Sequence, residues 1–167
     1  MSLIDATYFV KDINVPSSTY SDLANYITRF EKEILQKLLG YELWKLVAAY
    51  DGSPGVITDF VDGKEYTNSA GDLDKWNGIT NSDLISLVAY YVFYHWVRDK
   101  ETTTGTNGTL QLVSENSLGA SPAQRLHAAW VVLQELYEEA YDFLSENMDD
   151  YPTWIFTPLG NVNAWDL

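Results

Sequence analysis

The chain contains no cysteine and only two histidines and two methionines among its 167 residues. Without cysteine it forms no disulfide, holds no metal through a thiolate and has no thiol nucleophile. Basic residues are also scarce, because 10 Lys and Arg stand against 24 Asp and Glu, for a formal net charge of −14. This composition argues against a nucleic-acid-binding surface, which depends on clustered positive charge.

Long apolar runs are missing as well. The most apolar stretch, residues 84–97, is shorter than a bilayer-spanning helix and contains His95. The first ten residues include Asp5 and no basic cluster, so we expect no export signal. With 46% hydrophobic and 14% aromatic residues, the chain is expected to fold as one soluble domain over residues 1–167.

Two main helices and a short one are predicted between residues 19 and 100. A capping box at Thr19 and Asp22 opens an amphipathic helix that Gly40 interrupts, and a short helix over residues 41–49 follows. A second capping box at residues 80–83 opens a helix that is apolar nearly all round. An element of this kind is predicted to be the central helix of the bundle.

The third helix has the clearest start. Ser121 is the expected cap, and Pro122 occupies the first helical position. The fold class is therefore predicted to be mainly α, a bundle of three main helices plus a short one. Its core is expected at about residues 19–49, 80–100 and 121–148.

The segments between the helices are unusually long. Residues 51–79 contain several glycines and show no helical period, and residues 102–120 form a second long connection. Such connections are typical of functional loops or projecting hairpins. Residues 106–109, with Asn107 and Gly108, predict a tight hairpin turn, and residues 149–167 are interpreted as an extended C-terminal arm.

The residues that commonly carry catalysis lack a catalytic spacing. Neither His95 nor His127 has the helical pattern of a zinc site, and the pair Asp72 and Asp74 lacks the pattern of a calcium loop. We therefore expect no enzyme, no cofactor and no metal. One alternative stays open, a small acidic metal-dependent hydrolase that uses Asp72, Asp74 and His95.

The tryptophans give a stronger signal. Trp76, Trp154 and Trp165 lie in extended segments, where a small domain has difficulty burying them, and large aromatic side chains are favoured as interface anchors. For Trp76, burial in the chain's own core is equally open. The predicted subunit, portal or tail interface residues are Trp76, Asn107, Gly108, Leu110, Leu112, Trp154, Phe156 and Trp165.

Several motifs together resemble a known family. They are Ile34–Gly40, Lys75–Ile79, the aromatic run Tyr90–Trp96, Thr102–Gly105 with Glu115–Ser117, and Ser121–Ala123 followed by Trp130. In helix order and loop placement the chain is similar to the head–tail connector, or head-completion, proteins of tailed phages. The neck ring proteins of crassvirus-type phages are the nearest setting.

The resemblance implies a structural virion protein at the phage neck, assembled in the host cytoplasm. As a homo-oligomer of about twelve copies, it would form a ring that joins the portal protein to the tail or to further neck ring proteins. Double-stranded DNA would pass through the lumen without specific binding, and no membrane would be involved. The C-terminal arm would dock into the next subunit or the portal. A soluble regulatory adaptor that binds one host protein through this arm is a further alternative.

Overall fold

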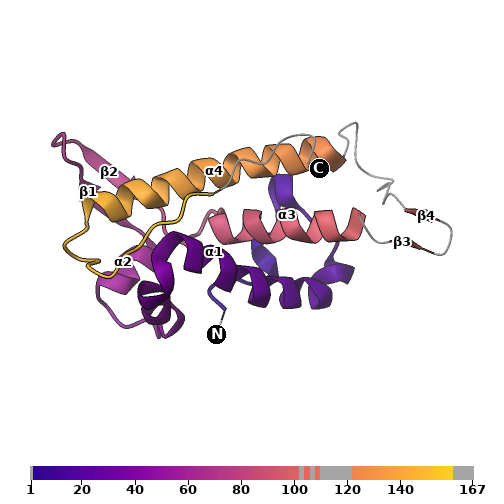
Figure 1. Ribbon diagram of the computed structural model, residues 1–167, viewed down its shortest axis with the longest axis horizontal. Coiled ribbons are helices and arrows are strands. Elements are labelled where there is room, and N and C mark those ends of the chain that lie inside the picture. The colour runs from indigo at the N-terminus through magenta and orange to yellow at the C-terminus, as the bar shows by residue number, and fades with distance from the viewer. Residues whose placement is uncertain (1, 102–103, 106–107, 110–121, 160–167) are drawn as a thin grey trace.

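The protein is an elongated helical bundle with a hairpin at each end (Figure 1). The computed structural model describes residues 2–101, 104–105, 108–109 and 122–159. The predicted mainly α fold is confirmed. Its elements are α1 (Tyr20–Ala48), α2 (Val56–Asp62), α3 (Leu87–Glu101) and α4 (Pro122–Glu146), with the strands β1 (Lys64–Thr67), β2 (Leu73–Trp76), β3 (Thr104–Gly105) and β4 (Gly108–Thr109).

Helix α3 is the centre of the bundle, packed between α1 and α4 (Figure 1). Residues 87–94 are all buried, including both Tyr91 and Tyr94. A helix that is apolar on every side needs neighbours on every side, and α1 and α4 turn their apolar faces toward it. The expectation of a central aromatic helix is therefore confirmed.

The starts of the first two long helices differ from the predicted capping boxes. Helix α1 begins at Tyr20 as expected, but the Thr19 hydroxyl donates a hydrogen bond to the Pro16 carbonyl at 2.7 Å and does not cap the helix. Asp22 instead pairs with Lys100 of α3 at 2.6 Å. The second prediction is wrong in position, since α3 begins at Leu87 and not at residue 80.

The start of α3 at Leu87, later than predicted, has a local cause. The Asn81 side chain accepts a hydrogen bond from the Ile85 N–H at 3.1 Å and donates one to the Ile85 carbonyl at 2.6 Å. Leu84 between them has a φ of 56°. An asparagine that closes such a turn competes with helix formation, so the apolar run enters the helix several residues later.

The segment 51–79 contains more structure than its sequence indicated. Its expected hairpin is present, because β1 and β2 pair antiparallel with Lys64 opposite Trp76. The absence of a helix was a wrong prediction, since α2 occupies Val56–Asp62. Its seven residues are too few to display a clear period, and its buried residues Phe60 and Val61 face the core.

The second hairpin is confirmed at the level of strand pairing. Gly105 pairs with Gly108, and Thr104 with Thr109, so residues 106–107 connect the strands. Within the described part of the chain, no helix combines the length and apolar character needed to cross a membrane.

Candidate interaction surfaces

Helix α1 is broken at Gly40, as predicted. Gly40 has φ 72° and ψ 167°, a backbone conformation that is essentially restricted to glycine. The residues before it, 36–39, therefore behave as a helix end, and a helix end leaves its last carbonyl groups without N–H partners. These carbonyls need donors from another part of the chain.

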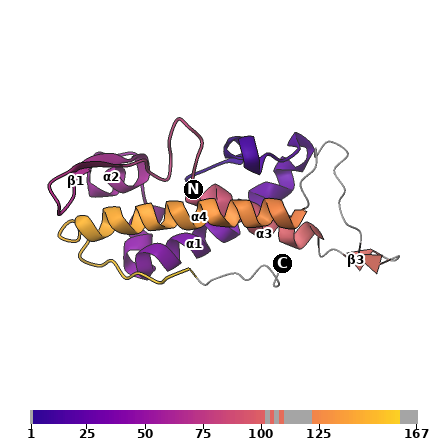
Figure 2. The same ribbon diagram turned by 90° about the horizontal axis from the view of Figure 1, so that it is seen from above.

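The chain after α4 supplies those donors. The Ile155 and Thr157 N–H groups donate to the carbonyls of Leu39 and Lys37 at 3.3 and 3.0 Å. The Trp154 indole N–H donates to the Leu38 carbonyl at 2.7 Å. Figure 2 shows this segment turning back after α4 and running along the bundle.

The first part of the extended arm predicted for residues 149–167 packs on the chain's own helices. Tyr151 is buried, and its hydroxyl donates to the Val56 carbonyl at 2.9 Å. The Tyr137 hydroxyl of α4 donates to the Thr157 carbonyl at 2.7 Å. Residues 151–159 therefore belong to the folded bundle because they satisfy the helix break and cover α4.

Together with Tyr141 of α4, the same segment builds a largely aromatic surface, here called the kink patch, which consists of Tyr141, Trp154, Ile155 and Phe156. The rings of Tyr141 and Phe156 lie 4.6 Å apart, and those of Tyr141 and Trp154 lie 5.5 Å apart. Ile155 is 66% exposed beside Gly40, and Tyr141 is 40% exposed. An exposed aromatic cluster that is fixed in place is the kind of surface that proteins use for contacts.

The predicted interface residues fall into three groups. Trp154 and Phe156 lie half-buried in the kink patch. Trp76 is buried in the core, where its indole N–H donates to the Phe60 carbonyl at 2.7 Å and its ring stacks on Phe143 of α4. Gly108 lies in β4, while Asn107, Leu110, Leu112 and Trp165 lie outside the described residues.

Trp76 is therefore corrected from an interface candidate to a core residue. It closes the connection between α2, the β1–β2 hairpin and α4, and at 2% exposure it has no surface to offer a partner. The kink patch residues Tyr141 and Ile155 were not anticipated. Gly40 was the sequence feature that could have indicated them, because a break in a helix leaves carbonyl groups that need N–H donors from another part of the chain.

A second surface is strongly acidic. From residue 126 to the end the chain has no Lys or Arg, and Glu135, Glu138, Glu139, Asp142 and Glu146 are all exposed on α4. We call these five residues, together with Asp74 of β2, the acidic wall. Burial and the charges of Glu135, Asp74 and Asp142 raise the pKa of Glu139, so carboxylates from two elements share one field.

The pKa of Tyr66, on the β1–β2 hairpin, is raised by some of the same carboxylates. Burial and the nearby carboxylates Asp74, Asp142 and Glu146 raise its pKa to about 12. Its hydroxyl lies 3.4 Å from Asp74, to which it donates. The acidic wall is therefore continuous between α4 and β1–β2.

His95 lies in a half-open cavity of about 300 Å³ between α1, α3, α4 and residues 157–159. Its ring stacks on Phe30 at 4.2 Å, and burial lowers its pKa to about 4. Beside it, Lys37 and Tyr91 both donate to the Glu33 carboxylate, at 2.9 and 2.7 Å. At neutral pH the Lys37 ammonium therefore balances the charge of the Glu33 carboxylate within this group of three side chains.

The open alternative of a metal-dependent hydrolase required His95 to meet Asp72 and Asp74. The charged groups that influence His95 are Glu33, Arg98, Asp99 and Lys37, whereas Asp74 acts on Tyr66 and Glu139. No cluster of three or more His, Asp or Glu side chains suited to a metal occurs in the described ranges. His127 is exposed near the start of α4.

Compared with known proteins, the chain matches no family model, no curated protein and no solved structure.

Proposed function

We propose that the chain is a structural subunit of a phage neck ring, which joins portal to tail around a channel for double-stranded DNA. The observation that carries the proposal is the acidic wall, in which carboxylates of α4 and Asp74 of β2 form one surface. The resemblance of the sequence motifs to head–tail connector proteins supports it independently.

The acidic wall suits a surface past which DNA moves. Phosphates and carboxylates repel each other, and focusing of the field in a narrow channel strengthens this repulsion. A duplex surrounded by such walls is centred and slides without being held. A surface that holds DNA needs the opposite charge, because binding releases the counterions of the phosphates.

The kink patch suits the other requirement of a ring, which is contact between subunits. Its aromatic residues are held by backbone hydrogen bonds and ring contacts, so few side chains need to be ordered when a partner binds. The elongated bundle separates its two hairpins by the full length of the molecule (Figure 1). One subunit can therefore reach neighbours at both ends.

The first test is the mass of the assembly. Native mass spectrometry of the purified chain, alone and with a portal protein of the same phage class, is expected to show a closed oligomer of one defined copy number. A chain that stays monomeric at every concentration and in the presence of the portal contradicts the proposal.

The second test concerns DNA. We expect the unmodified assembly not to retard duplex DNA in a gel, and the triple variant Glu135→Lys, Glu139→Lys and Asp142→Lys to retard it. A matched control carries the same charge change at Asp51, Glu65 and Asp83, which are exposed outside the acidic wall. Equal retardation by both variants contradicts a channel lined by the wall.

A further inference from the structure

The cavity beside His95 is lined mainly by aromatic rings. Tyr91, Tyr94 and His95 share one face of α3, since three and four residues separate Tyr91 from the other two. Trp130 of α4 forms another wall, and the centre of its ring lies 4.7 Å from that of Tyr94. The volume of about 300 Å³ lies at the lower end of the range for small-molecule sites, which combine such walls with a few polar groups.

The charges around this cavity balance. Lys37 and Glu33 form an ion pair at 2.9 Å. Burial lowers the pKa of His95 to about 4, so its ring is neutral at pH 7, and the opposite charges of Arg98 and Asp99 act on it in opposite directions. Burial of a further charge is costly unless an opposite charge compensates it. The cavity therefore suits an uncharged ligand better than an anion or a cation.

Two buried donors in the walls of the cavity have no partner. Of the four buried side-chain donors that make no hydrogen bond in the described ranges, two are the Tyr94 hydroxyl and the Trp130 indole N–H. Their side chains are only 2% and 8% exposed. Buried polar groups are almost always paired, so each exception needs an explanation. Two exceptions in neighbouring rings of one cavity indicate a missing hydrogen-bond acceptor.

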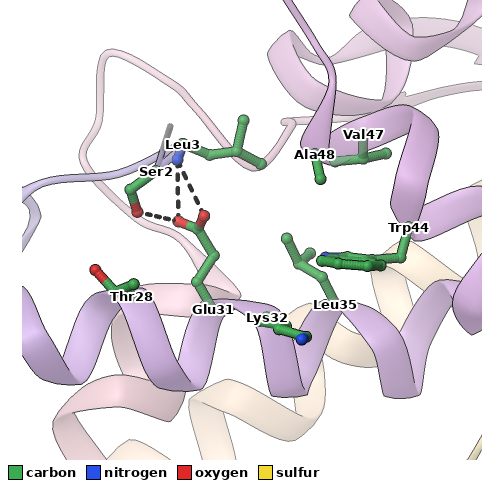
Figure 3. Close-up of a pocket in the computed structure, with 9 residues that line it drawn as sticks. All are labelled: Ser2, Leu3, Thr28, Glu31, Lys32, Leu35, Trp44, Val47 and Ala48. Atoms are coloured by element: carbon green, nitrogen blue, oxygen red, sulfur yellow. Dashed lines mark hydrogen bonds between the residues drawn. The ribbon is translucent and has the colours of Figure 1, made fainter.

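The larger hollow beside the break in α1 lacks this feature (Figure 3). It has a volume of about 340 Å³, and Figure 3 shows the Glu31 carboxylate on its polar side. This carboxylate accepts hydrogen bonds from the Ser2 hydroxyl at 2.7 Å and from the Leu3 N–H at 3.0 Å. None of the unpaired buried donors of the described residues belongs to its lining. The comparison therefore favours the cavity beside His95 as a ligand site.

We propose that the cavity beside His95 binds an uncharged aromatic amide, whose carbonyl oxygen accepts hydrogen bonds from the Tyr94 hydroxyl and the Trp130 indole N–H. A carbonyl oxygen has two lone pairs and can accept both bonds. The neutral His95 ring keeps one nitrogen as an acceptor for the amide N–H. The aromatic part of the ligand packs among the rings of the cavity.

Binding requires a small movement of the wall. Both donor atoms are shielded from solvent, so the ring of Trp130 turns to admit the carbonyl oxygen. The inference does not depend on the proposed function, because the cavity uses neither the acidic wall nor the rings of the kink patch.

Four probes of similar size test the ligand class. Benzamide, benzoate, benzylammonium and toluene are titrated into the full-length chain, and NMR follows the indole N–H signal of Trp130, which is identified by its loss in Trp130→Phe. We expect benzamide to shift this signal with a Kd at least tenfold lower than that of each other probe. Equal binding of all four probes, tighter binding of benzoate, or no shift with benzamide overturns the inference.

The variant Tyr94→Phe tests the donor itself. It is expected to raise the Kd of benzamide at least fivefold and to leave the Kd of toluene unchanged. Without ligand its unfolding temperature is expected to equal that of the unmodified chain, because the hydroxyl that it removes has no partner.

The matched control is Tyr137→Phe, which removes a buried hydroxyl that donates to the Thr157 carbonyl at 2.7 Å. Its unfolding temperature is expected to fall by about 3 °C. An equal fall in Tyr94→Phe would show that the Tyr94 hydroxyl is already paired, for example with a bound water, and overturns the inference. An unchanged Kd of benzamide in Tyr94→Phe overturns it as well.

Discussion

Trp76 and Trp154 use the same chemistry in two different regions of the molecule. Each donates its indole N–H at 2.7 Å to a backbone carbonyl, Trp76 to Phe60 and Trp154 to Leu38. Trp76 is almost completely buried, whereas Trp154 is half-buried beside the exposed Ile155. The first tryptophan stabilises the interior of a connection. The second couples the helix break to the surface that we propose for contacts.

The largest expected loss of unfolding free energy comes from a substitution in the interior region. Trp76→Ala removes a ring that stacks on Phe60 and Phe143, and burial of this kind is worth about 3–5 kcal/mol of unfolding free energy. Urea unfolding followed by circular dichroism measures it. Trp154→Ala is expected to cost less because its ring is partly exposed, and an equal loss would break the comparison.

The next largest loss of unfolding free energy is expected from a substitution at the helix break. Gly40→Ala is expected to cost about 2 kcal/mol, because the backbone conformation of Gly40 is strained for any other residue. The added methyl carbon would also lie 3.0 Å from the Ile155 Cβ. Gly52→Ala is the control, since Gly52 also has positive φ but no atom within 4 Å of the added carbon. A smaller loss at Gly40 than at Gly52 would show that residues 151–159 do not depend on the break.

The hydrogen bond of Trp154 can be removed without removing an aromatic ring. Trp154→Phe leaves the Leu38 carbonyl without its indole donor and is expected to cost about 1 kcal/mol. Tyr141→Phe in the same kink patch is expected to change the unfolding free energy by less than about 0.5 kcal/mol, as is usual for exposed positions. If the two variants are equal in unfolding experiments, the indole hydrogen bond does not hold the segment.

The smallest expected effect is a change in the pKa of His95, which depends on the C-terminal segment because residues 157–159 line the cavity around this ring. Its pKa of about 4 lies below the ordinary value of 6.5. A folded-state pKa that is lowered contributes stability above the unfolded pKa, and this contribution is lost as the pH falls from about 6.5 to about 4. Detaching the segment by Trp154→Ala is expected to return the pKa toward 6.5.

An NMR titration of the His95 ring protons measures this change. Leu73→Ala, on the distant hairpin, serves as the control and is expected to leave the His95 pKa near 4. A His95 pKa that is unchanged in Trp154→Ala would show that the helices alone bury the ring.

Much of the fold was predictable because its signals are local. Gly40 marked the break in α1, and Pro122 marked the start of α4. The run 84–97 indicated a central helix, since no other arrangement buries an element that is apolar on all sides.

The parts that could not be predicted depend on partners distant in sequence. The hydrogen bonds from residues 154–157 to carbonyls of α1 join positions more than a hundred residues apart, and no periodicity reports them. Trp76 looked like an interface anchor because the stacking partner Phe143 is equally remote. The hollow beside the break in α1 is lined by residues of both halves of the helix, by the N-terminal segment and by Trp44. The sequence indicated the helix break but not that these distant residues come together around a hollow.

Cryo-electron microscopy of the purified assembly with duplex DNA tests the central claim most directly. Our account predicts a closed ring of head-to-tail subunits, with the acidic wall of α4 and β2 facing a lumen wide enough for the duplex. Isolated compact subunits, or a ring whose lumen is lined by the Arg29 and Lys32 face of α1 while the acidic wall faces outward, would contradict it.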